Sequence, residues 1–228
     1  MIPALPSPTP KRFDLICSLF VAVYLISQVS SSKLFAIGPF QFPGGIIVFP
    51  LAYIFGDILP EVYGYAKARR AIWLGFFAAL LMSAVLLIVQ HLPSAPFWGN
   101  QQAYESILGF VPRITVASIA AYWMGEFANS YVLARMKILT RGRWLWTRTI
   151  GSTVVGQAVD SGVFGTVALA GVVPTRSVLT IIVSIYLFKV AYEVVATPLT
   201  YIAVDHLKRI EGIDVYDYNS KFSPFRLK

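Results

Sequence analysis

The chain has 228 residues, of which 57% are apolar and only 13% are charged, with a formal net charge of +8. A soluble domain carries about 25% charged residues, so this composition excludes an ordinary soluble protein and predicts an all-α integral membrane protein. The single cysteine, Cys17, excludes an intrachain disulfide, and the sequence has no Cys/His cluster of the kind that holds a structural zinc. The basic residues flank apolar segments and do not form one patch, which argues against direct nucleic-acid binding.

The elements expected along the chain begin with a proline-rich, disordered lead-in over residues 1–12. The next apolar segment is longer than a signal-peptide core and lacks a small-residue cleavage site, so we expect a retained first helix. A membrane span needs about 20 apolar residues. Six stretches meet this need: 13–34, 44–63, 71–91, 114–136, 147–171 and 177–207. We therefore expect one six-helix transmembrane domain over 13–207 and a cytoplasmic tail over 208–228.

At three places the sequence predicts a departure from a straight membrane span. The second span starts with Pro-Gly-Gly and contains Pro50, which favours a broken or re-entrant start. The connection over residues 91–112 carries Trp98 and Tyr104, which suit an interfacial loop or a short surface helix. The last span is long and contains Pro198, which predicts a kink or a continuation past the membrane surface.

The basic residues predict the orientation. Fifteen lysines and arginines lie in the N-terminal segment, in the loops after the second and fourth spans, and in the tail. Only Lys33, Arg113 and Arg176 lie on the other side. The positive-inside rule therefore places both termini in the cytoplasm. Three spans followed by three of opposite topology are compatible with two inverted halves, and the second and fifth spans each carry a mid-span Asp near glycine.

Five ionisable residues lie inside the expected spans, where a charge costs roughly 2.5–3.5 kcal/mol on insertion scales. They are Asp57, Glu126, Asp160, Lys189 and Glu193. Residues three or four apart share a helix face, and each of four spans has a polar face with an aromatic ring. These faces are Tyr53, Asp57 and Glu61; Tyr122, Glu126, Asn129 and Ser130; Gln157, Asp160 and Phe164; and Tyr186, Lys189 and Glu193.

Some of these residues also suit a purely structural role. Lys189 and Glu193 have the spacing of an ion pair within one helix, and Glu61 lies near the basic loop after the second span. Asn129 has the chemistry of a hydrogen bond between helices. Asp57 and Asp160 are harder to explain structurally, because one lysine cannot neutralise four acids.

The surplus acids have three options. Desolvation can protonate them, a cation can bind them, or a ligand rich in N–H donors can bind them, and all three suit transport. An acid beside an aromatic ring suits a flat nitrogen heterocycle, because the ring stacks and the carboxylate accepts two parallel N–H bonds. A guanine-type edge offers such donors, although the residues alone leave other cationic or heterocyclic solutes open.

One long motif and several shorter ones resemble a known family. FPLAYIFGDILPEVYGYAKAR, at 49–69, resembles the signature of the queuosine precursor transporter family, formerly grouped as vitamin uptake transporters. ANSYVLARMK (128–137), RTIGSTVVGQAVDSGVFG (148–165), KVAYEVVATPLTY (189–201) and DHLKRIEGIDVYD (205–217) also match. The resemblance implies six membrane helices and uptake of the 7-deazaguanine bases preQ0 or preQ1 across the bacterial inner membrane, for queuosine synthesis in tRNA.

Under this resemblance we expect a small-molecule site without metal or cofactor. Asp57, Asp160 and Glu193 would hold N–H donors, Gln157 and Asn129 would complete the edge, and Lys189 would orient an acid or meet the purine carbonyl. Glu61, Glu126, Tyr53 and Tyr186 are the remaining candidates. The choice between preQ0 and preQ1, the energy coupling and the choice between monomer and homo-oligomer stay open. The chain has no GxxxxGK[ST] phosphate loop.

Two other classes of function compete with this prediction. Two mid-span aspartates are the catalytic pair of an intramembrane aspartyl protease, and Phe55–Asp57 faintly resembles its GxGD motif, although position 54 is Ile. A structural or partner-binding membrane protein would use the same polar faces to join helices. A carrier for another nitrogen heterocycle or vitamin is the alternative within transport.

Overall fold

The computed structural model describes residues 10–139 and 145–213, and it consists mainly of helices. The helices are α1 (Phe13–Ser30), α2 (Phe49–Tyr63), α3 (Tyr65–Gln90), α4 (Gln101–Leu108), α5 (Val111–Leu139), α6 (Leu145–Leu169) and α7 (Thr175–Glu211). Among these residues, four stretches are long and apolar enough to cross a membrane: Phe13–Ser30, Ala66–Gln90, Gln101–Gly125 and Thr175–Ala196. The prediction of a mainly helical membrane protein is therefore confirmed.

The helical fold that the sequence predicts is interrupted in one place, where a small hairpin follows α1. Strands β1 (Leu34–Ile37) and β2 (Phe40–Pro43) pair antiparallel, with Ile37 opposite Phe40. Gly38 has a φ of +57° and occupies the first position of the two-residue turn, where a positive φ is needed. The first helix therefore ends at Ser30 instead of residue 34, and the apolar residues after it form strands.

The interrupted start predicted for the second span is present. A 3-10 helix over Gly44–Val48 precedes α2 and lies against the end of α1. A Cβ on Gly45 would lie 2.5 Å from the Ser27 carbonyl oxygen, so only glycine permits this approach. Gly64, with a φ of +83°, then joins α2 directly to α3, and the basic segment that was expected as a loop is helical.

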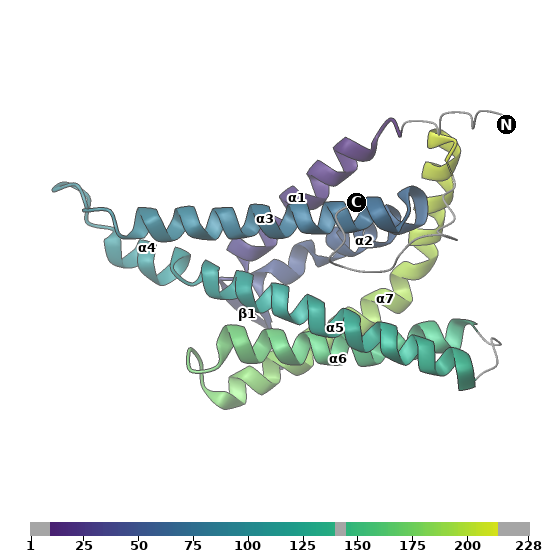
Figure 1. The fold of residues 1–228 in the computed structure, drawn as a ribbon. Coiled ribbons are helices and arrows are strands. Elements are labelled where there is room, and N and C mark those ends of the chain that lie inside the picture. The colour runs from purple at the N-terminus through teal and green to yellow at the C-terminus, as the bar shows by residue number, and fades with distance from the viewer. Residues whose placement is uncertain (1–9, 140–144, 214–228) are drawn as a thin grey trace.

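The other expected connections also differ in detail. Within the connection that was expected as an interfacial loop or a short surface helix, residues Gln101–Leu108 form α4, in which no residue is buried. At the turn between α6 and α7, the Arg113 guanidinium donates to the carbonyl oxygens of Val167 and Ala170 and so satisfies the end of α6. Helix α7 has 37 residues, which is about 56 Å of helix and longer than the bilayer core. It contains Pro198 and changes direction along its length (Figure 1).

The bundle has two apolar clusters, one toward each end. The first joins α1, α2, the start of α3 and the end of α7, around Leu59, Val62 and Val204. The second joins the hairpin, the 3-10 helix, α5, α6 and the first half of α7, around Ile46, Leu169 and Ile185. About 28 Å of α7 separates Ile185 from Val204 at 1.5 Å per residue. The polar residues predicted on α7 lie in this interval, between the two clusters.

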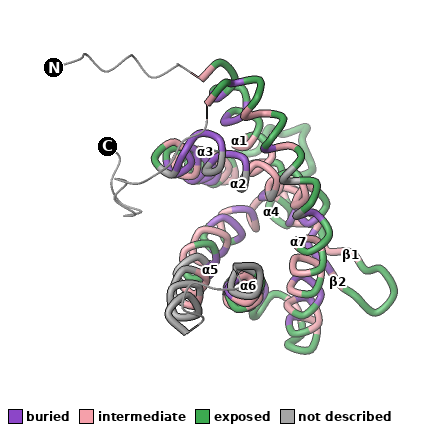
Figure 2. The backbone as a smooth tube through the Cα atoms, turned by 90° about the vertical axis from the view of Figure 1, so that its right-hand side faces the viewer, coloured by how far each residue is buried: buried purple, intermediate pink, exposed green. Residues whose placement is uncertain are grey.

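Helices α5 and α6 form a close antiparallel pair that lies beside α7 (Figures 1 and 2). Helix α3 connects to α5 through the edge-to-face contact of Trp73 with Trp123, whose ring centroids are 5.7 Å apart. A hydrogen bond of 2.9 Å from the Ser83 hydroxyl to the Thr115 hydroxyl joins the same two helices. These two contacts join α3 to α5.

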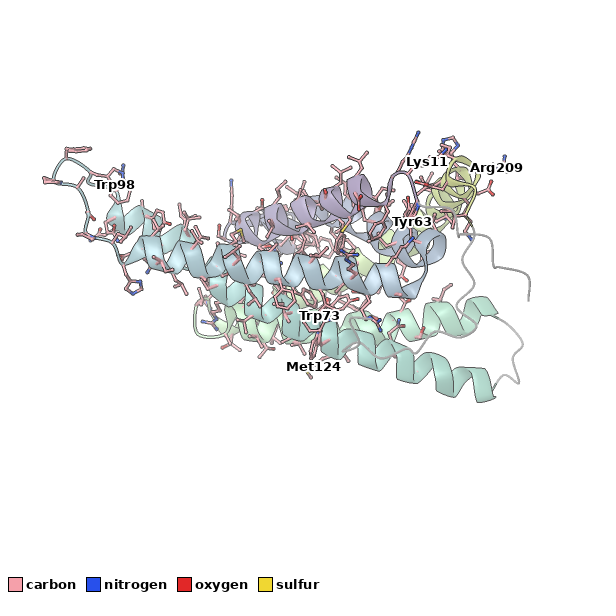
Figure 3. All side chains as sticks on the ribbon, turned by 45° about the horizontal axis from the view of Figure 1, so that its top comes forward. Lys11, Tyr63, Trp73, Trp98, Met124 and Arg209 are labelled. Atoms are coloured by element: carbon pink, nitrogen blue, oxygen red, sulfur yellow. The ribbon has the colours of Figure 1, made fainter. Side chains whose placement is uncertain are left out.

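The ends of three helices meet at Glu211, at one end of the molecule. The carboxylate of Glu211 accepts the backbone N–H groups of Lys11 and Arg12, at 2.8 and 2.9 Å, and the hydroxyl of Tyr63, at 2.9 Å. Figure 3 shows Lys11 and Tyr63 at this end and Trp98 at the opposite end. Burial raises the pKa of the Glu211 carboxyl, but the three hydrogen bonds and the positive charge of Arg12 together hold the pKa below its usual range.

Candidate functional site

The predicted polar residues of α5, α6 and α7 that the structure describes form what we call the polar layer: Asn129, Gln157, Asp160, Lys189 and Glu193. An ion pair between α6 and α7 joins two of them. The Lys189 ammonium donates to the Asp160 carboxylate, and the two side chains are only 15% and 19% exposed. The sequence suggested a pair of Lys189 with Glu193 within one helix. In the structure Lys189 reaches across to α6, because the antiparallel packing of α6 on α7 brings Asp160 level with it. Removing one member of a buried pair costs about 3–5 kcal/mol, so the two residues depend on each other.

Glu193 lies one turn further along α7 and also contacts α6. Its carboxylate accepts a hydrogen bond of 2.7 Å from the Thr153 hydroxyl. On α6, Thr153 lies two turns before Asp160. On α7, Glu193 lies one turn after Lys189. The two helices therefore present a continuous polar seam that contains two of the predicted acids and the predicted lysine.

An aromatic ring at the start of α2 lies against the lysine. The Lys189 nitrogen lies 5.2 Å from the centroid of the Phe49 ring, which is a cation–π distance. Phe49 contacts Tyr192 edge-to-face at 6.1 Å, and the Tyr192 hydroxyl donates to the Pro50 carbonyl oxygen at 3.3 Å. The described aromatic residue against the lysine is therefore Phe49, at the start of α2, whereas the sequence pointed to Tyr186.

Two buried amide oxygens lie free beside this seam. Neither the Asn129 Oδ1 atom nor the Gln157 Oε1 atom has a hydrogen-bond partner among the residues that the structure describes. A buried acceptor without a donor costs about 1–3 kcal/mol. Buried acceptors without a partner are typical of groups that a bound ligand satisfies. Both predicted amides therefore stay candidates for binding.

Two glycines set the distance between α5 and α6 at this level. A Cβ on Gly125 would lie 2.8 Å from the Asp160 Cβ, and a Cβ on Gly156 would lie 2.7 Å from the Asn129 Cβ. Each added carbon would also lie 3.0–3.1 Å from the carbonyl oxygen of the other glycine. The backbones can approach this closely only without side chains at 125 and 156. The crossing therefore positions Asp160 and Asn129.

Four predicted residues lie outside the side chains that the structure describes. They are Tyr53, Asp57, Glu61 and Glu126. Their backbones belong to α2 and α5, and α2 packs on α7.

Sequence reasoning missed several residues that the structure adds. Phe49, Thr153 and Tyr192 lie beside the ion pair or beside Glu193. Thr153 is seven residues before Asp160 and four before Gln157. The rule that residues three or four apart share a helix face would therefore have identified it, had the face been extended by one turn. Phe49 carries no signal of its own, because it is one phenylalanine among 16. Within the described part of the chain, no three His, Cys, Asp or Glu residues are arranged to hold a metal ion.

The sequence is similar to known transporters. The family described as "Putative vitamin uptake transporter" matches residues 43–203. The chain is 35% identical over 160 residues to the "Probable queuosine precursor transporter" of Bacillus subtilis (strain 168), and the match covers 70% of each chain.

Two further relatives have similar descriptions. The chain is 30% identical over 124 residues to the "Probable queuosine precursor transporter" of Haemophilus influenzae, covering 54% of this chain and 50% of the relative. It is 30% identical over 120 residues to the "Queuosine precursor transporter" of Escherichia coli K12, covering 53% of this chain and 52% of the relative. No solved structure matches significantly.

Proposed function

The chain belongs to the queuosine precursor transporter family, and on this premise we propose that it imports 7-deazaguanine bases through the polar layer between its two apolar clusters. It is a multi-pass membrane transporter and not an enzyme, so the aspartyl-protease alternative is set aside. The imported base, preQ0 or preQ1, would serve tRNA queuosine modification.

The surplus of hydrogen-bond acceptors around the ion pair carries this proposal. Asn129 and Gln157 offer free buried oxygens, and Asp160 and Glu193 add carboxylates, whereas Lys189 is engaged by Asp160. A 7-deazaguanine base presents several N–H donors along one edge, so it supplies what this layer lacks. A cation alone would satisfy the charges but would not require two neutral amides.

The roles follow from these positions. Asp160, Glu193, Asn129 and Gln157 accept N–H groups of the base, and Lys189 orients the Asp160 carboxylate. The ring of Phe49 takes the stacking role, for which the sequence analysis named no single aromatic residue, because it already lies at the lysine. Asp57, Glu61 and Glu126 remain in the proposal on the strength of the sequence motifs.

The same proposal includes the arrangement in the membrane. Helices α1, α2, α3, α5, α6 and α7 would be the six spans, in two inverted halves of three. Helix α2 has only 15 residues, but the 3-10 helix before it extends the segment. The distribution of lysine and arginine supports cytoplasmic termini in a bacterial inner membrane. A membrane-embedded domain over 13–207 remains the proposed organisation, although α7 continues to Glu211.

Uptake by reconstituted vesicles tests the function. Vesicles that contain the wild-type protein should accumulate labelled preQ0 or preQ1. Asp160→Asn should reduce uptake at least tenfold while the protein still inserts and purifies. Imposed proton and sodium gradients in the same assay identify the coupling. Uptake equal to that of empty vesicles for both bases, or normal uptake by the variant, would contradict the proposal.

A further inference from the structure

The end of the molecule at which Glu211 lies gathers basic residues from three separate parts of the chain. The hydrogen bonds of Glu211 bring together the start of α1, the junction of α2 with α3 and the end of α7. Figure 3 shows Lys11, Tyr63 and Arg209 at this end. What we call the basic cluster is the set of lysines and arginines in residues 10–14, 63–70 and 204–213, which are Lys11, Arg12, Lys67, Arg69, Arg70, Lys208 and Arg209. The positive-inside rule explains why they share one side of the membrane, but it does not require them to converge.

Two aromatic rings hold the ammonium of Lys67 beside the start of α1. Its nitrogen lies 5.7 Å from the centroid of the Phe13 ring and 6.0 Å from that of the Tyr63 ring. Phe13 directly follows Arg12 in the chain, and the Tyr63 hydroxyl donates to the same Glu211 carboxylate that accepts the N–H group of Arg12. The cationic side chains of α3 and of the start of α1 are therefore neighbours.

The acids of these segments leave this group of cations without an ion-pair partner. The Glu211 carboxylate offsets one positive charge, but it accepts the backbone N–H groups of Lys11 and Arg12 and leaves their side-chain donors unused. Among the described residues, no carboxylate forms an ion pair with the side chains of Lys11, Arg12 or Lys67. The other two acids of the three segments are Asp14 and Asp205. Since like charges that lie close together repel each other, an anion between these side chains would stabilise the arrangement.

The basic cluster lies where the lipid-facing surface of the bundle ends. Leu15 is exposed and follows Arg12 by three residues, and Leu74 is exposed and follows Arg70 by four. On α7, the exposed Ile202 lies two turns before the last basic residue of the helix. In a membrane such apolar side chains contact acyl chains, so cations one or two turns beyond them lie at the level of the headgroups. The anion that this position favours is therefore a lipid phosphate.

We propose that the basic cluster binds the phosphate group of an anionic phospholipid, with the side chains of Arg12 and Lys67 as its main donors. A guanidinium bonds two phosphate oxygens at once, and an ammonium adds a compact positive charge. A zwitterionic lipid carries a cation next to its phosphate, which the cluster repels, so the site prefers a headgroup with a net negative charge. A soluble phosphate ester lacks the acyl chains that the exposed leucines contact. This inference is independent of the solute that the polar layer carries.

The double variant Arg12→Gln with Lys67→Gln tests this site. Native mass spectrometry of the purified full chain should measure the binding of phosphatidylglycerol and of phosphatidylcholine with the same acyl chains. Each basic residue near an anionic lipid surface contributes roughly fivefold in affinity. The double variant should therefore bind phosphatidylglycerol roughly 25-fold more weakly than wild type, with phosphatidylcholine binding unchanged. Arg176→Gln removes an exposed charge at the other end of α7, so this matched control should bind both lipids like wild type.

Three results would overturn the proposal. The first is equal binding of the two lipids by wild type, or unchanged phosphatidylglycerol binding by the double variant. The second is displacement of the lipid by glycerol 3-phosphate at the same concentration, which would mean a site for soluble anions. The third is an equal loss for both lipids together with a lower melting temperature of the lipid-free double variant, which would mean that the two side chains support the fold. None of these measurements uses a base, so their failure leaves the proposed transport function untouched.

Discussion

The crossing of α5 and α6 gives the sharpest prediction. Gly156→Ala adds a carbon 2.7 Å from the Asn129 Cβ and 3.1 Å from the Gly125 carbonyl oxygen. Carbon atoms in contact normally lie about 3.5–4.0 Å apart. The helices must therefore separate by about 0.8 Å at this level, because backbone and Cβ atoms cannot rotate away as the end of a long side chain can.

The magnitude follows from this displacement. Overpacking of a close contact costs about 1–3 kcal/mol. For a chain of this size that corresponds to a melting temperature lower by roughly 2–12 °C. The separation also moves Asn129 away from Gln157 and Asp160, so binding of the base should weaken by at least tenfold if these groups contact it together.

The same helix supplies the matched control. Gly162 has no atom within 4 Å of the position that a Cβ would take. Gly162→Ala should therefore be neutral or stabilising by about 0.5–1 kcal/mol, because alanine loses less backbone entropy in a helix. Melting followed by intrinsic fluorescence and base binding should be measured for both variants in the same detergent. Wild-type melting and binding in Gly156→Ala would refute the role of the crossing.

Three further predictions concern single contacts. Lys189→Met should lower stability by about 3–5 kcal/mol in denaturant, and adding Asp160→Asn should recover part of the loss; no recovery would contradict the pairing. Thr153→Val should weaken base binding through misplacement of Glu193, by about tenfold in calorimetry, while leaving helix content unchanged. Because the folded pKa of Glu211 lies below the ordinary value of 4.5, its stabilisation is complete above that pH and is lost as the pH falls through the folded pKa. Glu211→Gln should therefore melt below wild type at neutral pH, and the difference should shrink in acid; a constant difference would contradict this.

The sequence predicts the helices well because long apolar stretches are a local property. It also places Gln157 and Asp160 on one helix face and Lys189 and Glu193 on another, since residues three or four apart on a helix share a face. The structure joins these two faces through the Asp160–Lys189 pair, which the sequence analysis did not predict.

The contacts between helices could not be predicted in the same way. Lys189 has an acid four residues away in its own helix, and only the antiparallel packing of α6 on α7 offers it Asp160, 29 residues earlier. The hairpin after α1 could not be predicted, because a short alternating pattern inside an apolar stretch does not distinguish a strand from a helix.

The contact of Glu211 with the start of α1 has a consequence for the order in which the protein is made. The N–H groups of Lys11 and Arg12 wait for a carboxylate that lies 200 and 199 residues later in the chain. The beginning of the first helix therefore lacks its partner throughout synthesis and gains it only when the last helix is in place. This contact therefore forms only after the end of α7 has been made, and a chain that stalls before residue 211 leaves the N–H groups of Lys11 and Arg12 without this carboxylate.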